Sequence, residues 1–201
     1  MKEISLVAPV KTPEDIENFC PVVKCRNFYV YHHKFLNKNF DYVKEFIETA
    51  HKHDAKIYVT FKHNITEENL TEIKKFINYL KDTEIDGIFI NSYAILEAIK
   101  THSLPYKVII DSYFDIHNLS GIDFVNMFHK VDQLIITEEI YMKNIAKIKQ
   151  YKNISLAIDS DNIPWCAEEI KKLHAIDSVV IKGKFADSAE ILEGIQLVEK
   201  I

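Results

Sequence analysis

The sequence predicts a closed barrel of eight parallel strands, each followed by a helix, and three observations favour this (β/α)8 architecture. Short runs of β-branched and aromatic residues alternate with segments whose apolar residues recur at spacings of three and four. Eight such units fit within 201 residues. The Gly-x-Gly-x-x-Gly motif is typical of open dinucleotide-binding sheets. Only four glycines are present here, and none lies in such a motif. We therefore expect a minimal, single-domain barrel over residues 1–201, with an open doubly wound sheet as the alternative.

The expected strands are apolar runs bounded by polar residues. They cover residues 4–7, 28–31, 56–61, 87–90, 107–110, 133–136, 154–158 and 179–181. Strands that alternate with helices pair in parallel through right-handed crossovers, which predicts one continuous sheet.

The expected helices begin at capping residues and bury one apolar face. The first begins at Thr12-Pro13-Glu14-Asp15, with threonine as N-cap, proline in the first turn and acids at the positive helix end. The last begins near Ser188. The apolar faces expected between them are Phe40, Val43, Phe46, Ile47 and Ala50; Leu70, Ile73, Phe76, Ile77 and Leu80; Ile95 and Ile99; residues 122–128; Met142, Ile145 and Ile148; and Ala167, Ile170 and Leu173.

Composition excludes several classes of protein. A net charge of −5 disfavours non-specific nucleic-acid binding. No apolar run has the roughly 20 residues of a membrane helix, and the N-terminal stretch is typical of a strand rather than a signal peptide. Three cysteines cannot form a disulfide framework, which fits a reducing compartment. We expect a cytoplasmic protein without membrane contact.

Residues at the carboxyl ends of the strands are the site candidates, because active sites of barrel enzymes lie there. The candidates are Pro9, His32, His33, Lys62, His63, Asn64, Asn91, Ser92, Asp111, Ser112, Glu138, Glu139, Asp159, Asp161, Lys182 and Lys184. Strand ends are also where any chain turns polar, so each position alone is a weak signal.

Three groups within this ring indicate particular chemistry, each with an alternative. His32-His33 and His63, with Asp111 and Asp159, could bind a divalent metal. Adjacent strand residues face opposite sides, however, and no His-x-His or His-x-x-x-His spacing supports this site. Glu138-Glu139 could supply a general acid or base, one side chain inward and one outward, or an acidic helix start. Lys182 and Lys184 could hold an anionic substrate group or lie at the surface.

Five stretches together resemble the barrel of the U32 peptidase-like family, which includes collagenase-like proteases and anaerobic hydroxylation proteins. They are residues 6–9 (LVAP), 50–60 (AHKHDAKIYVT), 111–118 (DSYFDIHN), 136–140 (ITEEI) and 179–188 (VVIKGKFADS). Each motif alone is modest, but their order along the chain is specific.

Departures from the family pattern fall where its chemistry is expected. Lys182 and Lys184 replace a glutamate and an arginine, and Glu138 replaces another arginine. The family's Cys-rich segment after the seventh strand is absent. Three scattered cysteines cannot supply the four ligands of the iron–sulfur cluster that hydroxylating members hold. No cofactor is therefore predicted, and a divalent metal is left as the lesser alternative.

The resemblance and the polar ring together imply an enzyme that acts on a peptide or small amide at the carboxyl end of the barrel. Glu139 would act as acid or base and His63 as a second proton-transfer group. The residues expected to bind substrate are Lys182, Lys184, Asp111, Asn118, Asn64 and Asn91. The alternatives are a catalytically reduced barrel that pairs with another protein, as a homo- or hetero-oligomer, and an RNA- or precursor-modifying redox protein.

Overall fold

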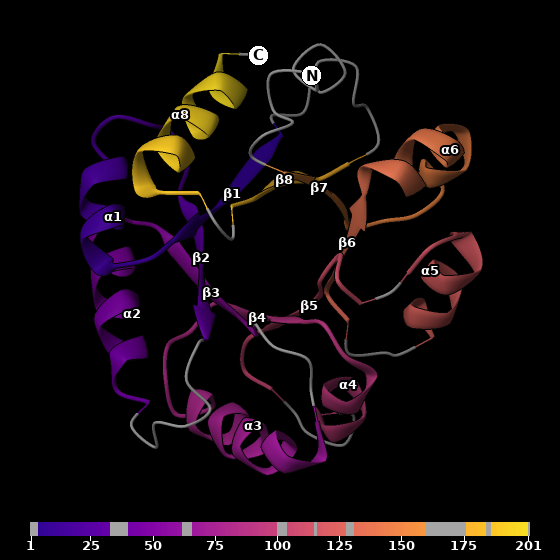
Figure 1. The fold of residues 1–201 in the computed structure, drawn as a ribbon, viewed down its shortest axis with the longest axis horizontal. Helices are drawn as coiled ribbons and strands as arrows, with labels where there is room; N and C mark the ends of the chain where they lie inside the picture. The colour runs from indigo at the N-terminus through magenta and orange to yellow at the C-terminus, as the bar shows by residue number, and fades with distance from the viewer. Residues whose placement is uncertain are drawn as a thin grey trace.

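The chain folds into a closed, eight-stranded parallel barrel surrounded by helices (Figure 1). The structure is a computed structural model that describes residues 4–32, 40–61, 66–99, 104–114, 116–127, 131–159, 176–183 and 186–200. Each strand pairs with its neighbour in sequence, and β1 closes the barrel against β8 through the register Leu6 to Val179. The predicted (β/α)8 fold is confirmed.

The strands agree with the predicted runs to within three residues at either end. They are β1 (Ser5–Val10), β2 (Asn27–His32), β3 (Lys56–Phe61), β4 (Gly87–Ile90), β5 (Lys107–Ile110), β6 (Gln133–Thr137), β7 (Ile154–Asp159) and β8 (Ser178–Lys182). The helices are α1 (Pro13–Phe19), α2 (Tyr42–Lys52), α3 (Glu67–Leu80), α4 (Tyr93–Ile99), α5 (Leu119–Asn126), α6 (Glu138–Ile148) and α8 (Ser188–Glu199). The helix expected around Ala167, Ile170 and Leu173 lies outside the described residues.

Side-chain caps fix the helix starts that the sequence predicted. The carboxylate of Asp15 accepts a hydrogen bond from the backbone nitrogen of Thr12 at 3.1 Å, directly before Pro13. Asp187 and Glu190 form a reciprocal box at the start of α8, each carboxylate accepting from the other's backbone nitrogen. Both boxes satisfy amide groups that have no partner within the helix.

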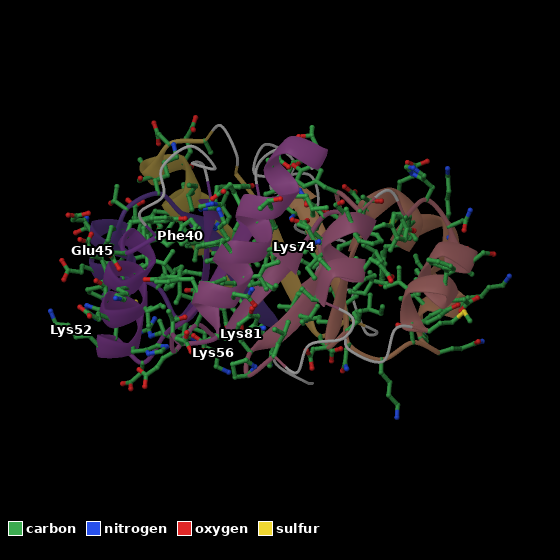
Figure 2. All side chains as sticks on the ribbon, turned by 90° about the horizontal axis from the view of Figure 1, so that it is seen from below. Phe40, Glu45, Lys52, Lys56, Lys74 and Lys81 are labelled. Atoms are coloured by element: carbon green, nitrogen blue, oxygen red, sulfur yellow. The ribbon has the colours of Figure 1, made fainter. Side chains whose placement is uncertain are left out.

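Strands and helices run in opposite directions around the barrel wall. In Figure 2, Lys56 at the start of β3 lies along the lower edge with Lys52 and Lys81 at the ends of their helices. Glu45, in the first turn of α2, lies higher. The upper edge in this view is therefore the face where the strands end.

Helix α6 departs from the predicted packing. Ile148 is buried as expected, but Met142 and Ile145 are 47% and 39% exposed, and Ile140 and Tyr141 are buried instead. Asn144 has a non-helical backbone conformation, and its side-chain nitrogen donates to the Ile140 carbonyl at 2.9 Å. Ile140 and Tyr141 lie eight and seven positions before Ile148, so the buried face keeps the helical repeat, and the expected face was placed one residue too far along the chain.

Apolar side chains fill the barrel in two separate clusters. The larger one packs the outward strand positions, such as Phe28 and Val59, against the helices. The smaller one consists of alternate strand residues and fills the interior: Val7, Tyr29, Tyr31, Tyr58, Phe89, Ile109, Ile135, Ala157 and Val180. The interior is therefore a packed core rather than a pore.

Cys25 belongs to the structural core. Its thiol donates to the carbonyls of Leu6 and Asn27, and its backbone nitrogen donates to Glu199 of α8 at 2.7 Å. Burial raises the pKa of the Cys25 thiol to about 12. The thiolate, which is the reactive form, is therefore strongly disfavoured in the folded protein.

We expect Cys25 to resist iodoacetamide at pH 8 until the barrel unfolds. Peptide mapping by mass spectrometry should show that its labelling rate rises with urea in parallel with the loss of circular dichroism. Rapid labelling of Cys25 in the native protein would contradict this burial.

Candidate functional site

In six strands, β3 to β8, the interior changes from apolar to polar at the next inward position toward the carboxyl end. Tyr58 is followed two residues later by Thr60, Ile109 by Asp111, and Val180 by Lys182. Asn91, Thr137 and Asp159 occupy the equivalent positions after Phe89, Ile135 and Ala157. Because side chains alternate along a strand, these six residues form a ring above the apolar core.

A cavity of about 230 Å³ opens at this ring, beside the ends of β5 to β8. We call it the cup; its lining residues are Ser112, Tyr113, Thr137, Glu138, Glu139, Ala157, Asp159 and Lys182. The volume lies just below the range of about 300–1,000 Å³ that is usual for drug-sized ligands. The cup therefore suits a small molecule or the end of a chain.

A buried ion pair forms the floor of the cup, with Lys182 as a lining residue and Asp111 behind it. The ammonium of Lys182 contacts Asp111 Oδ1, and the two side chains are only 4% and 1% exposed. Thr60 Oγ1 donates to Asp111 Oδ2 at 3.2 Å, and Ser112 Oγ donates to Oδ1 at 3.1 Å. The carboxylate is thus held by donors from three other residues.

Aromatic rings surround the lysine nitrogen. The ring centroids of Tyr29, Phe89 and Tyr113 lie 5.7, 5.8 and 5.1 Å from Lys182 Nζ, within the range of cation–π attraction. The Tyr29 hydroxyl donates to the Ile181 carbonyl at 2.8 Å. Burial, reinforced by Tyr31 and Asp111, raises the pKa of Tyr29 well above its usual value, so this hydroxyl stays protonated.

Glu139 lies at the rim of the cup, in the first turn of α6. Its Oε1 pairs with Lys143 at 2.5 Å, and its side chain is 73% exposed. The hydrogen bond from Lys143, with its positive charge, lowers the pKa of Glu139. Glu139 is therefore a carboxylate at neutral pH, suited to act as a base rather than as an acid.

Glu138 and Glu139 both line the cup, which corrects the expectation of one inward and one outward side chain. That expectation assumed strand geometry. The strand ends at Thr137 and α6 begins at Glu138, so adjacent residues are turned by the helix angle instead of by strand alternation.

His32 does not face the barrel interior, where the predicted metal site would lie. His32 faces away from the barrel axis, stacks on Phe76 with centroids 4.1 Å apart, and contacts the Tyr42 hydroxyl through Nδ1. Tyr31 takes the inward position. His33 and His63 lie outside the described residues, and among the residues that the structure describes no three His, Cys, Asp or Glu side chains group as a metal site.

The other predicted substrate-binding residues divide into three groups. Lys182 and Asp111 come together at the floor of the cup. Asn91 and Asn118 do not line the cup: Asn91 Nδ2 donates to the Phe61 carbonyl at 3.0 Å, and Asn118 Oδ1 accepts from the Gly121 nitrogen as the N-cap of α5. Asn64 and Lys184 lie outside the described residues.

We expect Asn118→Ala to lower the free energy of unfolding by about 1 kcal/mol because the α5 cap is lost. Asn118→Ser should retain most of the stability, since serine can also cap a helix. Urea unfolding of the three proteins checks this. If both variants matched wild type in stability, the cap would be energetically irrelevant.

Several residues that line the cup or surround its ion pair were not selected from the sequence, namely Tyr29, Thr60, Phe89, Tyr113, Thr137 and Ala157. The inward alternation of strand side chains identifies all of them except Tyr113. Tyr113 lies in the turn after β5, and no strand pattern predicts its position over Lys182.

The fold and its ring define a (β/α)8 barrel of enzyme-like architecture, with a polar cup at the carboxyl ends of its strands. The sequence matches Peptidase family U32 over residues 27–159, more than half of the chain. The protein therefore belongs to peptidase family U32, as the motifs suggested. The match runs from β2 to β7, so Asp111 lies within it and Lys182 lies beyond it.

Solved structures support the fold alone. A truncated 3-deoxy-D-arabino-heptulosonate 7-phosphate synthase from Thermotoga maritima is 11% identical, with a TM-score of 0.60 over 98% of this chain and 86% of its own. Orotidine 5'-monophosphate decarboxylase from Methanocaldococcus jannaschii is 15% identical, with a TM-score of 0.54 over 100% and 98%. No curated protein matches the sequence significantly.

None of the helices that the structure describes is both long enough and apolar enough to cross a membrane.

Proposed function

We propose that this protein is an enzyme that acts on a peptide or other small amide in the cup. The observation that carries the proposal is the buried Lys182–Asp111 pair at the floor of the cavity. Burying two charges is costly even when they pair, so such pairs are weak contributors to stability. A pair retained where barrel enzymes place their active sites favours a role in chemistry.

The lysine is suited to polarise a carbonyl group. Asp111 and the three aromatic rings hold its ammonium in place. A fixed donor of this kind stabilises the negative charge that develops on an amide oxygen during attack, without reorganising in the reaction. Asp111 compensates the charge of Lys182, so the lysine acts as a hydrogen-bond donor rather than as the anion clamp that the sequence suggested.

Glu139 is the proposed base. As an ionised carboxylate at the rim, it can take a proton from an attacking water and return it to the leaving amine. Asp159, which lines the same cavity and pairs in register with Lys182, is the second carboxylate in position for this role. His63 remains the proposed second proton-transfer group.

A turnover screen tests the proposal. Wild-type protein and the variants Lys182→Met and Glu139→Gln are incubated with defined dipeptides and small amides, and products are measured by mass spectrometry. We expect turnover in wild type and losses of about 100-fold in each variant, the scale of removing one oxyanion donor or one general base. Lys147→Met and Glu193→Gln, exposed helix positions with the same chemical changes, should retain activity.

Two results would count against the proposal: turnover that survives Lys182→Met, or no amide consumed by a folded wild-type protein.

The alternative function, in which the barrel pairs with another protein, rests on a different surface. Tyr93 of α4 and Phe124 of α5 stack edge to face with centroids 5.9 Å apart, and they are 48% and 47% exposed beside Met127 at 73%. Contiguous apolar surface of this kind marks interaction sites. Native mass spectrometry of protein purified gently from its own host tests this alternative. A stable complex that Phe124→Asp disrupts would favour the accessory role.

A further inference from the structure

Lys182 carries a primary amine and lines the cup, and among the cup's described lining residues it is the single basic side chain. Its nitrogen contacts a carboxylate that is 1% exposed, and the centroids of three aromatic rings lie 5.1 to 5.8 Å from it. Burial disfavours the charged form of a lysine, and proteins use buried lysines to form imines with carbonyl compounds.

We propose that Lys182 forms a protonated imine with small, uncharged aldehydes or ketones that enter the cup, with Asp111 as the counter-ion. This activity goes beyond amide hydrolysis. It rests on the cup as a site, but it does not require that any amide is cleaved there.

The condensation balances with the groups in place. Asp111 accepts one proton from the ammonium, and the freed amine attacks the carbonyl carbon. A second proton moves from nitrogen to oxygen to give the carbinolamine. Asp111 then returns its proton to the hydroxyl, which leaves as water, and the carbon–nitrogen double bond forms with one proton left on nitrogen. No oxidant or reductant is consumed.

The electrostatics of the site favour the product as well as the starting state. Before reaction the buried carboxylate faces an ammonium, and afterwards it faces an iminium of the same charge. Thr60 and Ser112 donate to Asp111 in both states, so the carboxylate stays in position. No buried charge is left without its counter-charge, which would otherwise be the main obstacle in a site of low dielectric.

The cup also selects the class of carbonyl compound. Asp111 neutralises Lys182, and the remaining charged residues of the lining are Glu138, Glu139 and Asp159, all acidic. An anionic keto acid would be repelled, whereas a neutral hydroxyketone would not. The volume of about 230 Å³ suits a small compound, and the Ser112 and Thr137 hydroxyls offer hydrogen bonds to it.

Reductive trapping tests this inference. The full chain is incubated at neutral pH with dihydroxyacetone and cyanoborohydride, which reduces an iminium to a stable secondary amine, and modified lysines are mapped by mass spectrometry. We expect Lys182 to be modified at least about tenfold faster than exposed Lys147, because only Lys182 has a neighbouring acid–base group. Pyruvate, the anionic counterpart, should modify Lys182 more slowly than dihydroxyacetone.

Two variants keep the test decisive. Lys182→Arg retains the charge beside Asp111 and cannot form an imine at this position. The total modification of this variant should therefore fall to that of the surface lysines alone. Asp111→Asn should slow trapping at Lys182 because the proton acceptor is lost. Circular dichroism verifies that both variants are folded, and a destabilised variant is compared at a lower temperature where it is folded.

Equal rates at Lys182 and at the surface lysines in wild type would overturn the inference, as would undiminished total trapping in Lys182→Arg. Amide turnover is scored separately on the same preparations. Trapping without amide turnover would support imine formation at Lys182 and contradict the proposed amide hydrolysis. Amide turnover without trapping would support hydrolysis and contradict imine formation.

Discussion

Replacing Lys182 by methionine is expected to lower the free energy of unfolding by about 3–5 kcal/mol, because Asp111 would remain as a buried charge without its partner. Asp111→Asn is expected to act in the same direction, since it leaves the ammonium without a carboxylate. The double variant should be less destabilised than the sum of the two single changes, because neither charge remains. Urea unfolding of the four proteins at neutral pH gives the coupling energy directly.

An exposed pair on the same fold supplies the control. Glu139 and Lys143 form an ion pair on the surface of α6, with side chains 73% and 69% exposed. The cycle of Glu139→Gln and Lys143→Met should show a coupling energy of at most about 0.5 kcal/mol, because solvent screens exposed charges. Strict additivity at Lys182 and Asp111 would mean that the two groups do not interact in solution.

The double variant also separates stability from function. If Asp111→Asn with Lys182→Met recovers most of the stability but shows no turnover and no trapping, the pair is retained for chemistry. If it is as active as wild type, the floor of the cup has no catalytic role.

The barrel could be predicted because its signals are local. A run such as residues 56–61 identifies a strand through its own composition, and Thr12-Pro13 identifies a helix start through its own capping residues. Eight repetitions of these signals leave few topologies open. The same local reasoning misplaced the buried face of α6, where Ile140 and Tyr141 are buried instead of Met142 and Ile145.

The floor of the cup could be predicted only as a set of candidates. Asp111 and Lys182 were both in the polar ring, but they lie 71 positions apart and on strands that are not neighbours. The alternation of side chains along a strand shows that Asp111 and Lys182 both face inward. It does not show which acidic residue pairs with which basic residue. Asp159 is the register neighbour of Lys182, and a sequence argument would pair those two instead of Lys182 with Asp111.

Removing the ring of Phe89 is the second change expected to have a large effect. Phe89 is 1% exposed, and its centroid lies 5.3 Å from that of Tyr29 and 5.6 Å from that of Tyr58. Phe89→Ala should lower the free energy of unfolding by about 3–5 kcal/mol, from lost burial and the void left in a close-packed interior. Thermal and urea unfolding both measure this loss.

Phe124→Ala is the matched control, because the same atoms are removed from a ring that is 47% exposed. Its effect should be about 1 kcal/mol or less. Equal losses at the two positions would contradict a packed barrel interior.

The Phe89 variants also test whether the interior core positions the lysine above it. The Phe89 ring lies 5.8 Å from Lys182 Nζ, so a void there lets the lysine side chain settle into the barrel and away from the cup. Phe89→Leu keeps most of the volume without the aromatic face and should cost about 1 kcal/mol. If trapping at Lys182 falls in Phe89→Ala and is retained in Phe89→Leu, it is packing that holds the amine at the cavity. A loss in both variants would assign that role to the aromatic face, because only the cation–π contact is absent from both.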